Sequence, residues 1–488
     1  MFASRQSALA LLLGVTLQAC AAALAQGYDS GYSDYALLRE NGLVCFDERL
    51  PPPKRIPSCT LVIDRGGLEK RELAKVYLAR AQAFQGAADE QAALKDLSSA
   101  VRSDPRSTRA LMGRGNYYAS KSDYSHALED YDRALKIEHS DPGIYDDRGN
   151  ALYALGRRDE ALADFTRAIA LDPHDVTAYS NRATAYLASG RLDLALADLT
   201  QVIRAEPGNG KALYDRGTAY ERSGELDKAL DDYRNAVRLR PSFAPAYAAV
   251  GRLLKAKNPD AALAALDEAI RLDPGSAALG SRASLSLSLG RPELALRDLD
   301  QVIARGGADS IAYLDRGVAH EKLGHLEDAI SDYSRSIELA PGTAAHIDRG
   351  YAYVRLQQLD KALVDFDAAL QIDPQNMPAL LGRAQANQAS KHLAASLEDY
   401  TRVIQADPSN ATAYFRRGNV HFDQREFSAA VSDYSDSLRL DPNQALALYN
   451  RAVAAQHLGR LKDAAQDRRR ALALDPSLGS GELRAPDK

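Results

Sequence analysis

A repeat of 34 residues constrains the fold of this chain more than any other feature of its sequence. Small residues, preceded by arginine in most units, recur at this interval through most of the 488 residues. They are Ala81, Gly115, Gly149, Ala183, Gly217, Gly251, Ala283, Gly317, Gly350, Ala384, Gly418 and Ala452. A period of this length is typical of a stack of like units, each of which buries its apolar face against its neighbours.

One unit, residues 211–241, shows what is repeated. Leu213, Gly217 and Tyr220 follow helical spacing, and residues 223–225 interrupt the pattern. A second apolar stripe then runs from 226 to 237, and Pro241 ends it because proline cannot continue a helix. The unit is therefore predicted to be a helical hairpin.

Small and large residues alternate at fixed places in the second helix. Alanine follows the small residue by twelve positions, as at Ala229, and an aromatic or leucine follows by sixteen, as at Tyr233. With the closing proline, this pattern resembles the tetratricopeptide repeat (TPR). The resemblance implies an all-α fold, a right-handed α-α superhelix (TPR solenoid) of about twelve helical hairpins. It also implies that the first helices line a concave groove that holds peptides or protein segments. We assign residues 73–476 to twelve such units and 477–488 to a C-terminal tail.

The first 25 residues have the composition of an export signal. Arg5 provides the positive charge, residues 8–17 are apolar, and residues 23–25 give the small-x-small pattern that precedes a signal-peptidase cut. We therefore expect residues 1–25 to be a signal peptide and the mature chain to lie in the periplasm. Residues 17–20 also resemble a bacterial lipobox, in which Cys20 is lipidated and anchors the chain as an outer-membrane lipoprotein. A third interpretation is that the N-terminal segment is not cleaved and stays in the membrane as an anchor.

Export affects the interpretation of the other two cysteines. Cys45 and Cys59 form an even pair, and in an oxidising compartment a disulfide is the expected state, with two buried free thiols as the alternative. Residues 59–67 match residues 299–307 at five positions. Residues 26–72 are therefore interpreted as an N-terminal segment that carries a degenerate half-repeat cap.

Composition and motifs narrow the classes of function. A net charge of −5 argues against a general nucleic-acid binder, which would be basic. The sequence has no HExxH, no GxSxG and no complete P-loop, and the repeats leave no segment for a catalytic domain. We expect no catalytic residues, no cofactor, no metal and no enzymatic activity.

Two charged positions vary together. Eleven units carry arginine before the small residue and aspartate fifteen positions after it, as in Arg216 and Asp232. The single unit without the arginine, at Val250, also lacks the aspartate, at Ala265. A joint loss predicts a structural salt bridge across the hairpin, since a lone buried charge would be costly.

Partner-binding residues are expected on the exposed face of the first helices. Asparagine side chains there can both donate hydrogen bonds to a peptide backbone and accept them from it. Aromatic residues in the last repeats suggest an apolar anchor site near Phe415, Phe422 and Tyr449. Members of this family that bind chaperone tails use a carboxylate clamp, a set of side chains that includes lysine. That clamp is not expected here, because Asp146 and Phe415 stand where it needs lysine. The resemblance places on the concave face Asn116, Asp146, Asn150, Asn181, Tyr214, Asp215, Asp315, Tyr351, Phe415, Asn419, Phe422, Tyr449 and Asn450.

The sixth unit departs from the pattern. Only 32 residues separate Gly251 from Ala283, and Pro259 is predicted to lie in a shortened turn. This departure has two interpretations. It is either a kink that divides the repeats into two groups or a deletion that the loops absorb.

Taken together, these features predict a non-catalytic scaffold of the bacterial cell envelope that binds proteins or peptides. One alternative is a lipid-anchored assembly factor for pili, secretins or outer-membrane proteins, in which the membrane contact depends on Cys20. Another is a glycan-binding or enzyme-accessory protein. The sequence does not specify the oligomeric state.

Overall fold

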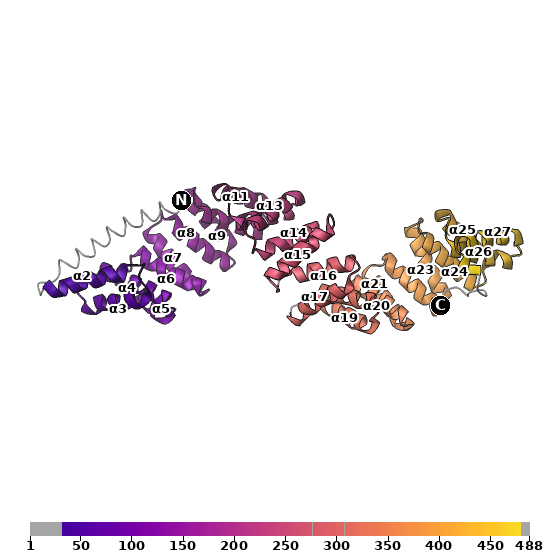
Figure 1. Ribbon diagram of the computed structural model, residues 1–488, viewed down its shortest axis with the longest axis horizontal. Helices are drawn as coiled ribbons and strands as arrows, with labels where there is room; N and C mark the ends of the chain where they lie inside the picture. Colours follow the sequence, from indigo (N-terminus) through magenta and orange to yellow (C-terminus); the bar gives the residue numbers. More distant parts are fainter. Residues whose placement is uncertain (1–31, 276, 307, 480–488) are drawn as a thin grey trace. The chain divides into compact units, whose positions relative to one another are not determined.

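The computed structural model of the protein describes residues 32–275, 277–306 and 308–479. The predicted signal peptide and Cys20 lie outside these residues. Within the described ranges the chain forms 26 α-helices, paired into about 13 hairpins (Figure 1). Helices α4 to α27 form the repeats, and α2 and α3 add one hairpin before them. The predicted all-α solenoid of helical hairpins is confirmed.

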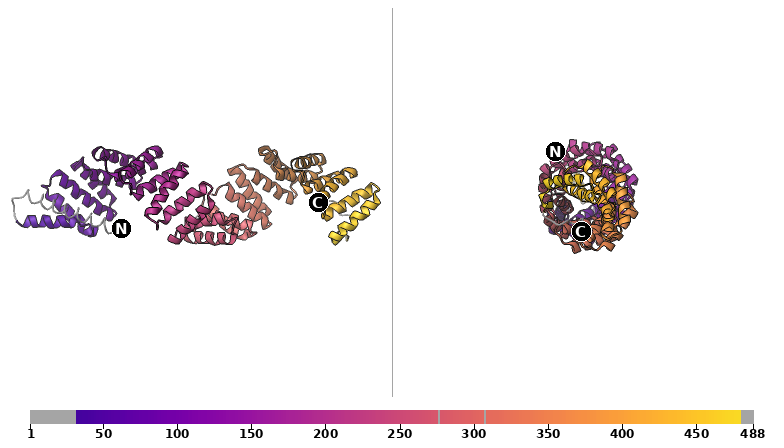
Figure 2. Two further views of the ribbon diagram at one scale, coloured as in Figure 1. Left: turned by 90° about the horizontal axis from the view of Figure 1, so that it is seen from above. Right: turned by 90° about the vertical axis from the view of Figure 1, so that its right-hand side faces the viewer.

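The helices group into two compact units, divided between Pro241 and Ser242, and in each unit successive helices lie side by side (Figure 2). Unit 1 contains α2 (Tyr32–Phe46), α3 (Pro52–Arg65), α4 (Lys70–Gly86), α5 (Glu90–Ser103), α6 (Thr108–Ser120), α7 (Tyr124–Ile137), α8 (Pro142–Ala154), α9 (Arg158–Leu171), α10 (Val176–Ala188), α11 (Leu192–Ala205), α12 (Gly210–Arg222) and α13 (Leu226–Leu239).

Unit 2 contains the remaining hairpins and a short 3-10 helix. Its helices are α14 (Ala244–Leu254), α15 (Pro259–Leu272), α16 (Ala278–Ser288), α17 (Pro292–Ala304), α18 (Ser310–Lys322), α19 (Leu326–Leu339), α20 (Thr343–Arg355), α21 (Leu359–Ile372), α22 (Met377–Ala389), α23 (Leu393–Ala406), α24 (Ala411–Asp423), α25 (Phe427–Leu440), α26 (Ala445–His457), α27 (Leu461–Leu474) and η1 (Pro476–Gly479). Among the described residues, no helix combines the length and apolar character needed to cross a bilayer.

Each hairpin is closed by close packing between its two helices. The large side chain of the second helix lies directly on the small residue of the first, so that a Cβ added at Gly317 would lie 2.5 Å from Tyr333. Tyr333 itself is completely buried. The core is therefore distributed along the array as one filler per hairpin, a pattern that repeats with the sequence period.

The turn between the two helices also repeats. Eleven hairpins place the residue seven positions after the small residue at positive φ, in the left-handed region that glycine adopts most easily. These residues are Ala88, Ser122, Gly156, Gly190, Gly224, Gly290, Gly324, Gln357, Lys391, Arg425 and Gly459.

The sixth repeat is the exception, and one expectation for it is wrong. Pro259 is the first residue of α15 and does not lie in the turn, while Asn258 caps that helix through its side chain. Proline suits this position because its missing N–H would have no partner there in any case. One missing residue falls at this turn, where α14 ends early and the left-handed turn residue is absent, and the other falls between Pro274 and Ala283, before α16.

The predicted disulfide is confirmed and closes the first hairpin. Cys45 of α2 and Cys59 of α3 are bonded, and both are completely buried. Arg55, 5% exposed, donates from Nε to the Cys45 carbonyl oxygen over 3.1 Å and from Nη2 to that of Ala79 over 3.3 Å. The guanidinium therefore ties the disulfide-linked hairpin to α4 of the first repeat.

Candidate ligand-binding surface

The arginine and aspartate that vary together are in contact in the structure. Arg216 donates from Nε and Nη2 to the two carboxylate oxygens of Asp232, over 2.7 and 2.9 Å, and the pair spans α12 and α13. The hydrogen bonds that Arg216 donates to Asp232 raise the pKa of Arg216, since they favour its charged form. In the other ten pairs Nε and Nη2 likewise donate to the two carboxylate oxygens. These pairs are Arg80–Asp96, Arg114–Asp130, Arg148–Asp164, Arg182–Asp198, Arg282–Asp298, Arg316–Asp332, Arg349–Asp365, Arg383–Asp399, Arg417–Asp433 and Arg451–Asp467.

Most of these arginines also contact the preceding hairpin, which the sequence analysis missed. Arg148 donates from Nη1 to Asp132 of α7 over 2.7 Å, so one guanidinium bridges two hairpins. The sequence contains a signal for this contact. The acceptor is an aspartate, serine or threonine, and in all but the first unit it stands two positions after the place of the paired aspartate in its own hairpin. The other bridging pairs are Arg80–Thr60, Arg182–Thr166, Arg282–Asp267, Arg316–Asp300, Arg349–Ser334, Arg383–Asp367, Arg417–Thr401 and Arg451–Ser435.

Three of the predicted binding residues meet in unit 1. Asp146 of α8 accepts hydrogen bonds from Asn181 Nδ2 over 3.0 and 3.1 Å, and from Asn150 Nδ2 over 3.4 Å. Asp146 is only 7% exposed, and this burial raises its pKa to about 6 despite the two amides. The asparagine pair expected to bind a peptide backbone is therefore partly engaged by a carboxylate of the chain itself.

A second polar group lies beside the first. Asn116 of α6 accepts a hydrogen bond from the hydroxyl of Tyr131 over 2.6 Å, and it also bonds Asp147 of α8. Burial raises the pKa of Asp147 as well. Asp147 was missed from the sequence, although it stands at the same repeat position as Asn181, two residues before the small residue.

This repeat position forms what we call the inner row. Its polar members are half-buried residues of the first helices, and aspartate is the most frequent residue among them. The row consists of Asp147, Asn181 and Asp215 in unit 1 and of Ser281, Asp315, Asp348, Arg416 and Asn450 in unit 2. Its period in the sequence could have revealed Asp348 and Arg416, which were also missed.

The inner row of unit 2 holds two carboxylates in a desolvated setting. Burial raises the pKa of Asp348 of α20 to about 6, and the nearby charge of Glu321 adds to this effect. Burial also raises the pKa of Asp315 of α18, although Lys255 opposes the shift. In unit 1, Asp215 differs because it forms an ion pair with Lys211 over 2.6 Å.

The aromatic residues predicted on this face are mostly packed inside the hairpins. Tyr449 is 7% exposed, and the Phe415 ring packs on Tyr434 with 6.0 Å between ring centres. Phe422 packs edge-on against Phe427 at 5.4 Å. These rings therefore offer a partner less apolar surface than their positions in the sequence suggested.

The remaining predicted residues have similar internal contacts. Tyr214 packs on Tyr233 with 5.4 Å between ring centres. Tyr351 donates its hydroxyl to the Pro378 carbonyl oxygen over 3.0 Å, and burial raises its pKa. Asn419 accepts bonds from Tyr434 over 2.8 Å and from Asn450 over 2.9 Å.

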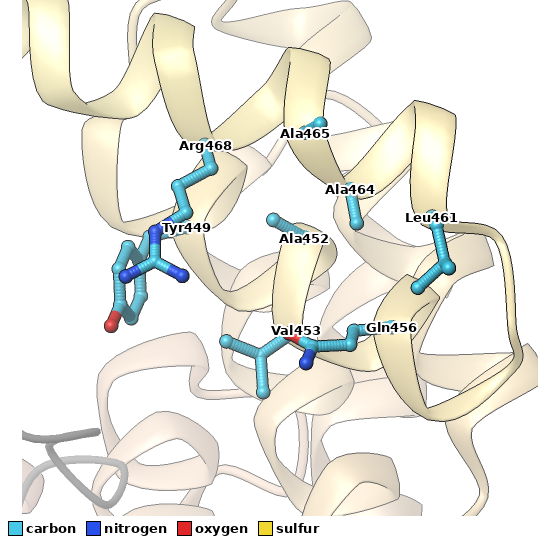
Figure 3. Close-up of a pocket in the computed structure, with 8 residues that line it drawn as sticks. All are labelled: Tyr449, Ala452, Val453, Gln456, Leu461, Ala464, Ala465 and Arg468. Atoms are coloured by element: carbon cyan, nitrogen blue, oxygen red, sulfur yellow. The ribbon is translucent and has the colours of Figure 1, made fainter.

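A cavity of about 210 Å³ lies in the last hairpin, between α26 and α27 (Figure 3). Arg468 stands where earlier hairpins carry the large apolar filler, and its exposed side chain leaves the space over Ala452 unfilled. The remaining lining residues are Tyr449, Val453, Gln456, Leu461, Ala464 and Ala465.

Models of the tetratricopeptide repeat match most of the sequence. One covers residues 78–143, 181–244, 214–277, 247–310, 281–344, 381–445 and 415–478, and two others cover 115–183 and 343–376. The chain belongs to the tetratricopeptide repeat family. It is accordingly a scaffold of the kind that binds proteins or peptides. No curated protein matches this TPR chain.

Solved structures with partial likeness to this TPR chain include the three repeat proteins that follow. YrrB, described as a TPR protein with an unusual peptide-binding site, is 25% identical over 38% of this chain and 95% of its own, with a TM-score of 0.34. PilW, a type IV pilus biogenesis factor, is 23% identical over 43% and 97%, with a TM-score of 0.40. A TPR protein from Parabacteroides merdae ATCC 43184 is 22% identical over 48% and 93%, with a TM-score of 0.40.

Proposed function

We propose that this chain is a non-catalytic scaffold of the bacterial cell envelope and that each of its two units binds protein segments rich in lysine or arginine through its own inner-row residues. The observation that carries the proposal is the set of half-buried carboxylates Asp147, Asp315 and Asp348. None of them belongs to the Arg–Asp pairs that hold the hairpins together.

Burial makes these carboxylates suited to a cationic ligand. Desolvation raises the pKa of each, so the ionised form is less stable than in water and gains stability when a positive charge comes close. A lysine or arginine side chain of a bound segment supplies that charge in a setting of reduced dielectric, where charge pairing is stronger than in water. Complementary charge of this kind favours specificity and fast association.

The test compares partner capture by the full chain and by variants of matched charge. Asp147→Asn with Asp348→Asn removes two inner-row charges, while Asp193→Asn with Asp360→Asn removes two exposed charges from second helices. Envelope proteins and a lysine-rich synthetic peptide are applied at increasing salt. We expect the inner-row variant to release both at lower salt than the wild type and the control variant. Equal release by both variants would overturn the role of the row.

The acids are better test positions than the aromatics of unit 2. Alanine at Phe415 would remove a packing partner of Tyr434 and so lower stability along with any binding. Asparagine keeps the shape of aspartate and changes only its charge, so a loss of binding is attributable to electrostatics.

We further propose that the chain reaches the envelope through its N-terminal 25 residues. Mass analysis of the mature protein tests the route. A chain that begins at Gln26 supports cleavage, while palmitate incorporated at Cys20 supports the lipid-anchored assembly factor. A full-length product in the cytoplasm contradicts both.

A further inference from the structure

Two histidines and an aspartate converge at the turn between α18 and α19. The side-chain nitrogen and oxygen donors of His320, His325 and Asp328 all lie within 4.8 Å of one another. All three residues belong to the same hairpin of unit 2.

The backbone of the turn holds these residues together. Gly324 adopts a φ of 83°, which reverses the chain after α18. The His325 N–H then donates to the His320 carbonyl oxygen over 2.9 Å. Asp328 follows in the first turn of α19. The relative positions of the three residues are thus set by main-chain geometry and not by flexible loop conformation.

His320 presents a buried nitrogen to this cluster. Its side chain is 16% exposed, and its Nδ1 is buried with no hydrogen-bond partner. On the other side of the ring, Nε2 lies 3.8 Å from Asp332, which is itself fixed by Arg316. A carboxylate on that side favours the tautomer with the proton on Nε2. The lone pair of Nδ1 then has neither a donor nor a cation beside it, and leaving it unsatisfied in a buried position is costly.

Another repeat of the same chain shows how this position is normally satisfied. His421 stands at the same place in α24, with Nε2 3.8 Å from Asp433. Its Nδ1 contacts a carboxylate oxygen of Glu426 over 2.7 Å. In the α18/α19 hairpin, the residue at the position of Glu426 is His325. A carboxylate partner is thus replaced by a second imidazole, and Asp328 stands where the other hairpin has Ala429.

We propose that His320, His325 and Asp328 bind a first-row transition-metal dication, with Zn²⁺ as the preferred ion. Two imidazoles and one carboxylate suit Zn²⁺, with water at the fourth position, and do not suit Ca²⁺ or Mg²⁺, which prefer oxygen ligands. A tetrahedral site requires donor separations of about 3.3 Å. His325 and Asp328 are exposed, so their side chains can rotate to close the remaining distance to His320.

The proposal gives the buried Nδ1 its missing partner. Asp332 acts as the outer carboxylate that orients the ligating histidine, a role that such groups commonly have in zinc sites. The bound ion would link the end of α18 to the start of α19 and stiffen the turn of that hairpin. This role does not depend on the inner row or on the proposed partner.

The test measures Co²⁺ and Zn²⁺ binding to the untagged, metal-stripped full chain. Visible absorption of Co²⁺ reports its coordination, and competition with Zn²⁺ gives the relative affinity. His325→Gln removes the imidazole ligand and offers His320 Nδ1 an amide N–H in its place, so it should fold normally. His126→Gln removes an exposed histidine, 59% exposed and paired with Asp123, and serves as the control.

We expect one equivalent of metal per wild-type chain and an unchanged result for His126→Gln. His325→Gln should weaken Zn²⁺ binding by at least about tenfold, because it removes a direct ligand where even outer-shell changes cost that much. Circular dichroism checks that the variant is folded. Wild-type binding no tighter than that of His325→Gln, or an equal loss in His126→Gln, would overturn the site.

Discussion

At the scale of single residues, the small position and its filler are matched in size. Gly317 packs under Tyr333, whereas Ala183 stands opposite the smaller Leu199. Two hairpins depart from this match, since Gly251 packs against Leu266 and Ala384 stands opposite Tyr400. Tyr400 is completely buried, and its hydroxyl has no hydrogen-bond partner. Tyr400 therefore carries an unsatisfied polar group in the core of its hairpin.

We predict opposite effects of removing two tyrosine hydroxyls. Tyr434→Phe breaks the bond to Asn419 and should lower the free energy of unfolding by about 1 kcal/mol. Tyr400→Phe removes an unpaired buried hydroxyl, so it should be neutral or stabilising. Urea unfolding of the two variants measures both effects. A clear loss of stability in Tyr400→Phe would show that its hydroxyl has a partner.

Asp348 gives a prediction that depends on pH. Its pKa is raised by burial to about 6 in the folded chain, so the folded state binds the proton more tightly than the unfolded state does. Wild-type stability should therefore fall as pH rises from about 4 to about 6 through this group. Asp348→Asn removes that penalty and should stabilise the chain by about 1 kcal/mol at pH 8, after allowance for solvent screening.

Thermal or urea unfolding at several pH values tests the sign. The gain in Asp348→Asn should shrink towards zero near pH 4, where the wild-type carboxyl is neutral in the folded chain and increasingly neutral in the unfolded one. Asp193→Asn, at an exposed position of a second helix, serves as the control. A gain that is constant with pH would point to packing or helix propensity and not to ionisation.

At the scale of the hairpin, the Arg–Asp pair joins two helices, and the third guanidinium nitrogen often joins two hairpins. Asp232 is 7% exposed at its side chain and Arg216 is 20% exposed, so each partner is largely removed from water. Loss of one leaves the other charged and desolvated, whereas loss of both leaves no charge behind.

We predict that Arg216→Ala lowers the free energy of unfolding by about 3 kcal/mol, while the double variant with Asp232→Ala recovers most of the loss. Val250 and Ala265 show that a hairpin of this chain tolerates the double absence. A double-mutant cycle measured by urea unfolding gives the coupling energy. Equal losses in the single and double variants would mean that the pair adds no coupling.

At the scale of the whole molecule, each repeat contacts mainly its neighbours, so a local change should stay local. The disulfide between Cys45 and Cys59 closes only the hairpin of α2 and α3. Closing a loop of about 15 residues stabilises by roughly 3 kcal/mol in the chain-entropy model. The ends of a repeat array are its least supported parts, and this bond strengthens one of them.

We predict that reduction speeds amide exchange in α2 and α3 by roughly 100-fold, which corresponds to that free energy. Exchange in α24 to α27 should not change, because the effect is carried only by nearest-neighbour contacts. Hydrogen exchange with and without a reductant measures both regions in one sample. A uniform rise over all helices would show that the chain unfolds as one cooperative body.

The sequence by itself determined the repeating parts of this molecule. A strict period specifies a helical hairpin, and the joint loss at Val250 and Ala265 identifies the Arg–Asp pair, since both depend on residues within one repeat. Pro259 shows where this reasoning ends: a proline predicts a helix boundary but does not say on which side of it the turn lies.

Only the tertiary structure decided the features that depend on the spacing between helices. The desolvation of Asp348, the burial of Tyr449 and the third contact of Arg148 follow from how closely neighbouring hairpins pack. The unpaired Nδ1 of His320 was likewise invisible, because the sequence shows only a histidine at a tyrosine position. Local periodicity encodes the hairpin, whereas burial and charge at each site arise from several segments that are brought together only by folding.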